Sequence, residues 1–376
     1  MGASPWALNT IKNGFRLLWH HQKPLLQREP VPFPPPVAKD QCSVLDLQVV
    51  EMLGKGAIER VDNPASPGFY SRLFTVPKPS GGYRPILDLS PLNKFLKKVT
   101  FKMDSPDSIR GILRRGDWAT SLDLKDAYFH VPISPKDRKW LRFMWRGEVF
   151  QYKVLPFGLS LSPWAFTKIV REVVTFSRSN KMRLHTYLDD WLTLASIKGV
   201  CSLHMDLLRR TTQRLGFVIH EDKSEFTPSQ EFTYLGMSFN TATWTVQPSQ
   251  ARRLSLSTQI RSLRAQARVS ARSLSSVLGK MESMARLLPL GRLHKRPFQR
   301  AFTSVFCQEK DSWNRRIDIQ PWFHEVTLQW LSLPWLASSS PITLPDPVRT
   351  VFTDASKEGW GGHMLVPLQQ QPKLDQ

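Results

Sequence analysis

The fold is decided by Arg183–Ala195, RLHTYLDDWLTLA, where two acidic residues interrupt a run of apolar and β-branched side chains. The run predicts two short strands, with Tyr187-Leu188-Asp189-Asp190 at the bend between them. Because Asp tolerates the left-handed backbone of a tight turn, we expect the acidic pair at its tip. Adjacent carboxylates repel each other, and a divalent cation relieves that repulsion. The stretch therefore predicts part of a metal site; the simpler alternative is an acidic turn exposed to solvent.

A second acidic position lies upstream, in Ser121–Ile133, SLDLKDAYFHVPI. The alternation of apolar and polar residues predicts a strand that ends near Asp123, followed by a turn that presents backbone N–H groups. The chain between Asp123 and Asp189 is long enough for two adjacent strands joined by a helical crossover. Carboxylates on neighbouring strands can hold two Mg²⁺ ions about 3.5–4 Å apart, which suits phosphoryl transfer. Taken alone, Asp123 has a simpler interpretation, as a strand-end cap or the partner of Lys125 or Arg138.

Further motifs surround these two segments. They are, in order, FTVPKP at 74–79, GGYRPILDLSPLN at 81–93, LPFGLS at 155–160, FVIHEDKSEF at 217–226 and YLGM at 234–237. Together, over roughly residues 45–240, they resemble the fingers and palm of a reverse transcriptase. The Leu-Pro-Phe-Gly and Tyr-Leu-Asp-Asp-Trp forms are similar to those of DIRS-type retrotransposons. The resemblance implies an α+β right-hand polymerase, with fingers, a palm on an antiparallel sheet, and a helical thumb and connection.

The resemblance also assigns the catalytic roles. Asp123 and Asp189 would bridge two Mg²⁺ ions, for which Mn²⁺ could substitute, and the carbonyl of Leu124 would be a neutral ligand. Asp190 would be an auxiliary carboxylate of the same metal site. Lys223 would act as general acid for the leaving pyrophosphate, the alternative being a solvated surface lysine.

Nucleotide contacts are expected from six residues, namely Lys78, Arg84, Asp126, Ala127, Tyr128 and Phe157. Lys78 and Arg84 would clamp the triphosphate, for which the planar fork of Arg is well shaped. The ring of Tyr128 would lie under the deoxyribose and exclude a 2′-hydroxyl, the alternative being a core tyrosine. Phe157 replaces the glutamine usual in retroviral enzymes, so apolar packing replaces a hydrogen bond.

The charge of the chain favours a polyanionic partner. Lys and Arg number 52 against 31 Asp and Glu, which gives a net charge of +21 and a pI near 10.2. Residues 245–300 carry twelve basic residues and one acidic residue, with apolar stripes at 256–267 and 274–288 that predict two amphipathic helices. Their basic faces would follow the template–primer backbone, unless they are merely solvated. The residues expected to contact nucleic acid are Gly158, Tyr234, Leu235, Gly236, Arg261, Arg264 and Arg268.

The chain divides into four expected regions. They are an N-terminal extension with a Pro-rich linker (1–40), fingers and palm (41–240), a basic helical thumb and connection (241–340), and a C-terminal segment (341–376). The last contains VRTVFTDASKEGWGGHM at 348–364, which resembles the truncated start of a ribonuclease H domain, with Asp354 as its first catalytic aspartate. We expect no RNA cleavage, because the other carboxylates of that metal cage have no clear match.

Other sequence features narrow the setting. The three cysteines are isolated, and no apolar run approaches the roughly 20 residues of a membrane span. We therefore expect an intracellular protein of the cytoplasm or nucleus, neither secreted nor bound to a membrane. The sequence predicts an RNA-directed DNA polymerase of a retroelement, acting with dNTPs on an RNA or DNA template–primer and open to other element-encoded proteins as partners. The alternatives are an RNA-templated RNA polymerase, a non-catalytic nucleic-acid-binding remnant, and a ribonuclease H.

Overall fold

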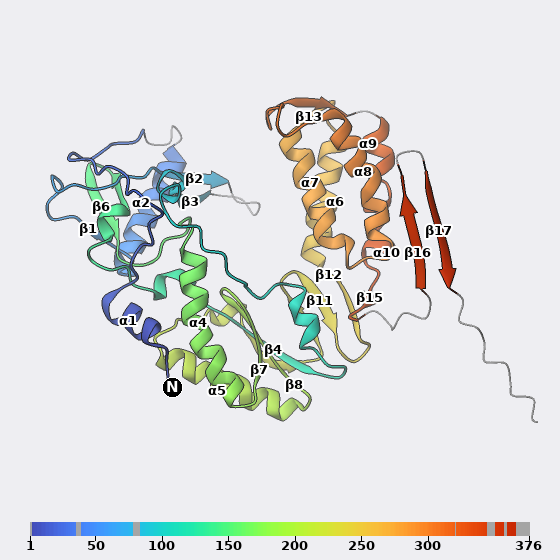
Figure 1. The fold of residues 1–376 in the computed structure, drawn as a ribbon, viewed down its shortest axis with the longest axis horizontal. Helices are drawn as coiled ribbons and strands as arrows, with labels where there is room; N and C mark the ends of the chain where they lie inside the picture. The colour runs from blue at the N-terminus through green and yellow to red at the C-terminus, as the bar shows by residue number, and fades with distance from the viewer. Residues whose placement is uncertain are drawn as a thin grey trace, which may run out of the picture.

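The computed structural model describes residues 2–34, 39–77, 83–319, 321–343, 350–356 and 359–365. Figure 1 shows three groups of elements: strands with α2 on one side, a sheet backed by α4 and α5 at the base, and an upright group of helices from α6 to α10. The strands within each sheet pair antiparallel. No helix in these ranges is long and apolar enough to cross a membrane.

The sheet at the base, here called the palm sheet, has the strand order β7-β8-β4-β9. Its strands are β4 (Trp118–Asp123), β7 (Arg183–Tyr187), β8 (Asp190–Ala195) and β9 (Glu225–Ser229), and its helices are α4 (Ser162–Ser179) and α5 (Lys198–Arg214). Leu122 and Trp191 pack into the core shared with α4 and α5, whereas Leu192 and Leu194 pack into a second core shared with β10–β12. Strands buried on both faces read as continuous apolar runs, which explains the apolar character of 191–195.

The group around α2 carries two small sheets. Its elements are α2 (Lys39–Gly54), β1 (Ile58–Arg60), β2 (Leu73–Pro77), β3 (Tyr83–Leu87), α3 (Ser90–Asn93), η3 (Arg138–Trp140), β5 (Arg142–Trp145) and β6 (Glu148–Tyr152). Helix α2 ends at Gly54, and only one of its apolar stripes faces the interior. Leu45, Val49 and Met52 are buried, whereas Leu47 is 72% and Val50 is 68% exposed. The helix carries two apolar stripes one residue apart, and only tertiary packing selects between them.

The N-terminal segment is part of the folded domain and not a loose extension. Helix α1 (Pro5–Asn13) packs on α4, where the Ser4 hydroxyl donates to the Glu172 carboxylate at 2.6 Å. The Trp6 ring lies 5.6 Å from the Trp164 ring. This segment lacks the long periodic pattern that a helix prediction needs, so packing against α4 could not be foreseen from its sequence.

The chain continues from the palm sheet into a second sheet and then into helices. The sheet contains β10 (Glu231–Tyr234), β11 (Met237–Asn240), β12 (Thr245–Pro248) and β15 (Ser340–Pro341) in that order, with β16 (Thr350–Ala355) and β17 (Trp360–Leu365) as a separate hairpin. The helical region contains α6 (Gln250–Arg264), β13 (Arg268–Ser270), α7 (Ala271–Ala285), α8 (Gly291–Val305), β14 (Arg316–Asp318), α9 (Pro321–Val326), η5 (Gln329–Leu331) and α10 (Leu333–Leu336).

The helical region differs from the two expected helices. A third helix, α8, follows them and includes Pro297. Ala267, expected on the first apolar stripe, is exposed because α6 ends at Arg264. Trp330 is fully buried in the core of this region. Figure 1 shows the β16–β17 hairpin beside these helices.

Candidate active site

Three carboxylates gather at one end of the palm sheet. Strands β4 and β8 pair so that Asp123 lies directly opposite Asp190. Leu188 and Asp189 form the two-residue turn between β7 and β8, closed by the pair Tyr187–Asp190. The backbone N–H of Leu124 donates to the carbonyl of Asp189 at 2.9 Å, which ties this turn to the end of β4.

The backbone of the turn departs from expectation. Leu188, and not an aspartate, has the left-handed conformation, with φ of 54°. A leucine in this region is strained, because its Cβ approaches the following carbonyl oxygen. The buried indole of Trp191 donates to the carbonyl of Leu188 at 2.9 Å and so stabilises the turn. Asp189 is left exposed at the tip, whereas Asp190 is half-buried.

The electrostatics of the cluster oppose full ionisation. Burial, followed by the charges of Asp189 and Asp123, raises the pKa of Asp190 to about 6. Burial also raises the pKa of Asp123, and the carboxyl groups of Asp123 and Asp190 are hydrogen-bonded to each other. The ammonium of Lys223, at the end of η4 (Glu221–Lys223), lowers the pKa of both groups in opposition to burial. A bound divalent cation would relieve this repulsion.

The donor chemistry suits Mg²⁺, because carboxylate and carbonyl oxygens are the ligands that hard cations prefer. The residues on either side of Leu124 are hydrogen-bonded to the segment 218–220. The Asp123 carbonyl accepts from the His220 N–H at 2.8 Å, and the Lys125 N–H donates to the Val218 carbonyl at 2.8 Å. However, in the part of the chain that the structure describes, no three His, Cys, Asp or Glu side chains are arranged as a metal cage. Asp123 and Asp190 lie directly opposite each other in the β4–β8 ladder. The expected metal ligands are thus neighbours, but the described residues do not form a ready-made metal cage.

Asp190→Asn is expected to stabilise the metal-free protein at neutral pH. The folded protein holds the Asp190 proton more tightly, with a pKa of about 6 against an ordinary value of 3.8. Stability therefore falls as pH rises through this window. The variant should escape that loss, which we put at about 1–2 kcal/mol at a half-buried, solvent-screened site. Urea unfolding between pH 4 and 8 measures the difference, and parallel pH profiles for variant and wild type would contradict it.

The aromatic side chains expected at the nucleotide site form a continuous wall. The Tyr128 ring lies 4.9 Å from the Phe157 ring and 5.7 Å from the Phe166 ring. Tyr128, in η2 (Ala127–His130), is 8% exposed, whereas Phe157 is 55% exposed. Burial, followed by the charge of Asp189, raises the pKa of Tyr128 to about 12, so the ring is within electrostatic range of the carboxylates.

Other expected nucleotide contacts have partners within the protein. Asp126 is left-handed, with φ of 51°, and its carboxylate forms an ion pair at 2.7 Å with Lys55, the residue that follows α2. Ala127 is buried. The structure gives only the backbone of Arg84, which lies opposite Val76 in the β2–β3 hairpin. Lys78 lies outside the described residues.

The turn at Gly158 lies against the strands near α2. Gly158 has φ of 91°, and a Cβ there would lie 3.2 Å from the carbonyl oxygen of Leu87. The side-chain amide of Asn93 donates to the Gly158 carbonyl at 2.8 Å and accepts from the Ser160 N–H at 2.9 Å. This close approach requires glycine, and it leaves Phe157 projecting beside Tyr128.

Several residues expected to contact nucleic acid lie elsewhere. Tyr234 is only 4% exposed, so its ring belongs to the interior and not to a binding surface. Leu235 and Gly236 form the β10–β11 turn with positive φ, and Gly236 lies against the Arg252 side chain of α6. The wrong expectation for Tyr234 arose because the motif alone does not show which face of β10 is buried.

The three arginines of the helical region differ in their surroundings. Arg261 is exposed on α6. Arg264 donates through Nε to the His324 ring at 3.2 Å, and Arg268 forms an ion pair with Asp318 at 2.8 Å across β13–β14. Arg261 is therefore the cleanest probe of a nucleic-acid contact on this face.

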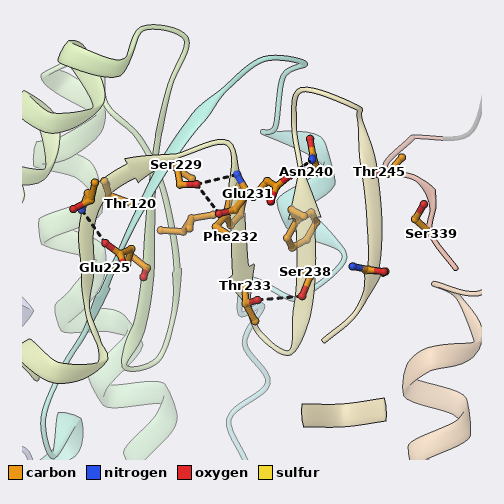
Figure 2. Close-up of a pocket in the computed structure, with 16 residues that line it drawn as sticks. Thr120, Glu225, Ser229, Glu231, Phe232, Thr233, Ser238, Asn240, Thr245 and Ser339 are labelled. Carbon is orange, nitrogen blue, oxygen red and sulfur yellow. Dashed lines mark hydrogen bonds between the residues drawn. The ribbon is translucent and has the colours of Figure 1, made fainter. Parts of the chain in front are cut away.

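A polar groove of about 750 Å³ lies between β9 and the polar face of β10–β12 (Figure 2). Hydroxyl and amide side chains line much of it, and the Thr233 and Ser238 hydroxyls lie 3.1 Å apart. Its charged lining residues are Glu225 and Glu231, with no Lys or Arg among the lining residues that the structure describes. None of the expected site residues lines it, so its chemistry does not match a phosphate path.

Comparison with known proteins agrees with this geometry. Residues 76–239 match the family model described as reverse transcriptase (RNA-dependent DNA polymerase). The Pro-Pol polyprotein of feline foamy virus is 26% identical over 186 residues, covering 49% of this chain and 15% of that protein. The transposon Tf2-3 polyprotein of Schizosaccharomyces pombe is 26% identical over 155 residues, covering 41% of this chain and 12% of that protein. The chain thus spans under a sixth of these curated relatives.

A solved structure shows the same overall fold. The foamy viral protease-reverse transcriptase in complex with RNA/DNA hybrid superposes with a TM-score of 0.66 at 17% identity. The match covers 93% of this chain and 46% of that one. The expected fold class, an α+β right-hand polymerase, is confirmed. Residues 76–239 of this chain are therefore similar to the reverse transcriptase family.

Proposed function

We propose that this chain is the RNA-directed DNA polymerase of a retroelement of the DIRS type, acting on dNTPs and a template–primer. One observation carries the proposal: the register of β4 and β8 sets Asp123 opposite Asp190, with Asp189 in the adjoining turn. The match of residues 76–239 to the reverse transcriptase family model supports the reaction type. The Leu-Pro-Phe-Gly and Tyr-Leu-Asp-Asp-Trp forms support the subgroup.

The residues of the site divide the work of nucleotidyl transfer. Asp123 and Asp189, with Asp190 and the Leu124 carbonyl, would hold Mg²⁺, which activates the primer 3′-hydroxyl and neutralises phosphate charge. Lys223 is coupled electrostatically to Asp123 and Asp190, which supports a role as general acid for the leaving pyrophosphate.

The wall of Tyr128 and Phe157 lies within electrostatic range of Asp189. Their rings are in contact, and Phe157 projects into solvent where a nucleotide can approach. An apolar wall of this kind excludes water from the reacting groups. It also leaves little room for a 2′-hydroxyl, which supports deoxynucleotides as substrates.

The template–primer would lie along the palm and the basic thumb. The segment 245–300, with its twelve basic residues against one acidic residue, forms α6, α7 and most of α8. The solved relative in complex with RNA/DNA hybrid supports a hybrid as the bound form. Asp354, the proposed first aspartate of a ribonuclease H segment, lies on β16 opposite Gly361.

Extension of a DNA primer on an RNA template tests the proposal. We expect extension with Mg²⁺ and dNTPs and little with ribonucleotides. Salt-sensitive binding of the hybrid without any extension would favour a non-catalytic remnant. Extension with ribonucleotides instead of dNTPs would favour an RNA polymerase.

Reversing Arg261, Arg264 and Arg268 to Glu is expected to weaken hybrid binding at low salt far more than nucleotide affinity. Arg261→Glu alone is the sharper variant, because Arg264 and Arg268 have partners within the thumb. It should lower the slope of log affinity against log salt by about 1, the effect of one phosphate contact. Arg214→Glu, an exposed change on α5 behind the palm sheet, is the control. Equal effects of the Arg261 and Arg214 changes would contradict a thumb contact.

A further inference from the structure

A buried chain of hydrogen bonds lies behind the catalytic turn. The Tyr234 hydroxyl, on β10, donates to the backbone carbonyl of Asp190 at 2.8 Å. Nδ1 of His185, on β7, lies 3.0 Å from that hydroxyl, and Nε2 of His185 lies 2.9 Å from the Ser108 hydroxyl in η1 (Ser108–Gly111). His185 is 2% and Tyr234 is 4% exposed. The chain thus links β7, β8, β10 and η1 through the buried side chains of His185 and Tyr234 and the exposed Ser108.

The hydrogen count fixes the direction of this chain. Tyr234 has one hydroxyl hydrogen, and it is donated to Asp190. Nδ1 of His185 must therefore carry a proton and donate to the Tyr234 oxygen. Burial lowers the pKa of His185 and so favours the neutral ring, whose Nε2 then accepts from Ser108. The Ser108 hydroxyl can also donate to the Ser105 carbonyl at 2.8 Å. The two acceptors compete for one hydrogen, so the bond from Ser108 to His185 is the weakest of the chain.

The surroundings of this chain are apolar. Ile109, Leu192, Leu194 and Phe239 belong, with Tyr234, to the core between the palm sheet and β10–β12. Polar groups in such a core are costly unless all are satisfied, and satisfied networks fix one geometry where apolar packing allows several. The hydrogen bonds are therefore better explained by the precise placement of β8 than by stability alone.

We propose that Tyr234 and His185 are positioning residues of the polymerase site, which hold the backbone at Asp190 and with it the catalytic turn. The proposal rests on the proposed function. Asp190 is the first residue of β8, and its carbonyl lies at the root of the turn that presents Asp189. Loss of the bond from Tyr234 lets this root shift relative to Asp123 on β4. A displacement of about 1 Å at reacting groups costs up to roughly a hundredfold in rate.

Tyr234→Phe removes one oxygen and keeps the ring. In single-nucleotide incorporation, we expect kcat to fall roughly tenfold or more, while KM for the dNTP and affinity for the hybrid stay near wild type. Amide hydrogen exchange of the peptide spanning 187–191 should become faster. Unchanged kcat and exchange would overturn the proposal. A loss of hybrid affinity with unchanged kcat would also overturn it, in favour of a direct nucleic-acid contact by Tyr234.

Two substitutions of His185 form a matched pair. The side-chain amide of Asn reaches the position of Nδ1, whereas the longer Gln reaches that of Nε2. His185→Asn keeps a donor toward Tyr234 and should retain most of the wild-type kcat. His185→Gln loses that donor and should resemble Tyr234→Phe. Equal losses in both, with equally lowered melting temperatures, would show a purely structural role and overturn the proposal.

Hydrogen exchange separates this proposal from the proposed function. If the wild type extends no primer, the polymerase assignment fails, yet the exchange of 187–191 still reports on the turn. Faster exchange in Tyr234→Phe and His185→Gln, but not in His185→Asn, would then support the placement of the turn by this chain. Identical exchange in all three variants and wild type would overturn it.

Discussion

Asp189→Asn is expected to abolish primer extension while leaving the fold and hybrid binding intact. Asp189 is exposed at the tip of the β7–β8 turn, so the substitution removes a charge without leaving a cavity. The proposed metal ligation stabilises the transition state by several kcal/mol. At about 1.36 kcal/mol for each factor of ten, its loss corresponds to a rate reduction of about a thousandfold or more. Single-turnover incorporation with dNTPs measures it.

The matched control is Asp222→Asn. Asp222 is an exposed carboxylate in η4, next to Lys223, and is not one of the three clustered acids. The same chemical change there should leave incorporation within about twofold, since exposed charges contribute little. Hybrid affinity should match wild type in both variants. Extension by Asp189→Asn at near the wild-type rate, or an equal loss in Asp222→Asn, would contradict the assignment of Asp189.

Asp189 and Asp190 are adjacent in sequence but differ physically. Asp189 is exposed and Asp190 is half-buried, with its pKa raised to about 6 mainly by burial. An exposed carboxylate can turn toward an incoming cation, whereas Asp190 is held in the ladder opposite Asp123. The three acids should therefore not be interchangeable. Asp190→Asn removes electrostatic repulsion from the cluster and so stabilises the fold. Asp189→Asn does so to a smaller extent, because water already screens the charge of Asp189.

The hairpin at 183–195 could be predicted from sequence because its signal is local. A short apolar run on each side of an acidic bend specifies two strands and a tight turn. The resemblance of the flanking motifs supplied the right-hand fold, which the structural match confirms. The pairing of Asp123 with Asp190 is a matter of register between distant segments, and the continuous apolar run of β8 does not specify that register.

The parts that sequence did not predict depend on tertiary contacts. Helix α2 buries Leu45, Val49 and Met52 and leaves a neighbouring apolar stripe exposed, because packing against the rest of the core determines which stripe faces inward. Tyr234 and His185 are uninformative as single residues, because a lone buried histidine is usually structural. Their significance appears only when β10 and β7 bring them together at 3.0 Å.

Tyr128 is the expected determinant of sugar selection, and the structure sharpens the experiment. The ring is nearly buried and contacts both Phe157 and Phe166. Tyr128→Ala therefore leaves a cavity and should destabilise the protein by about 3–5 kcal/mol, as large-to-small core substitutions do. Loss of activity alone would be uninformative in that variant, so the measured quantity must be a ratio of incorporation rates within one preparation.

Tyr128→Ala is expected to keep DNA synthesis and to admit ribonucleotides, because the ring no longer blocks the space around the sugar. The ratio of kcat/KM for a dNTP to that for its ribonucleotide should fall by about 10–200-fold, the range that exclusion of one small group supplies. Tyr128→Phe is the matched control, since it keeps the ring and should keep the ratio. If the Ala variant retains wild-type discrimination, Tyr128 is a core residue and the sugar gate lies elsewhere. If the Phe variant loses discrimination equally, the hydroxyl and not the bulk of the ring selects the sugar.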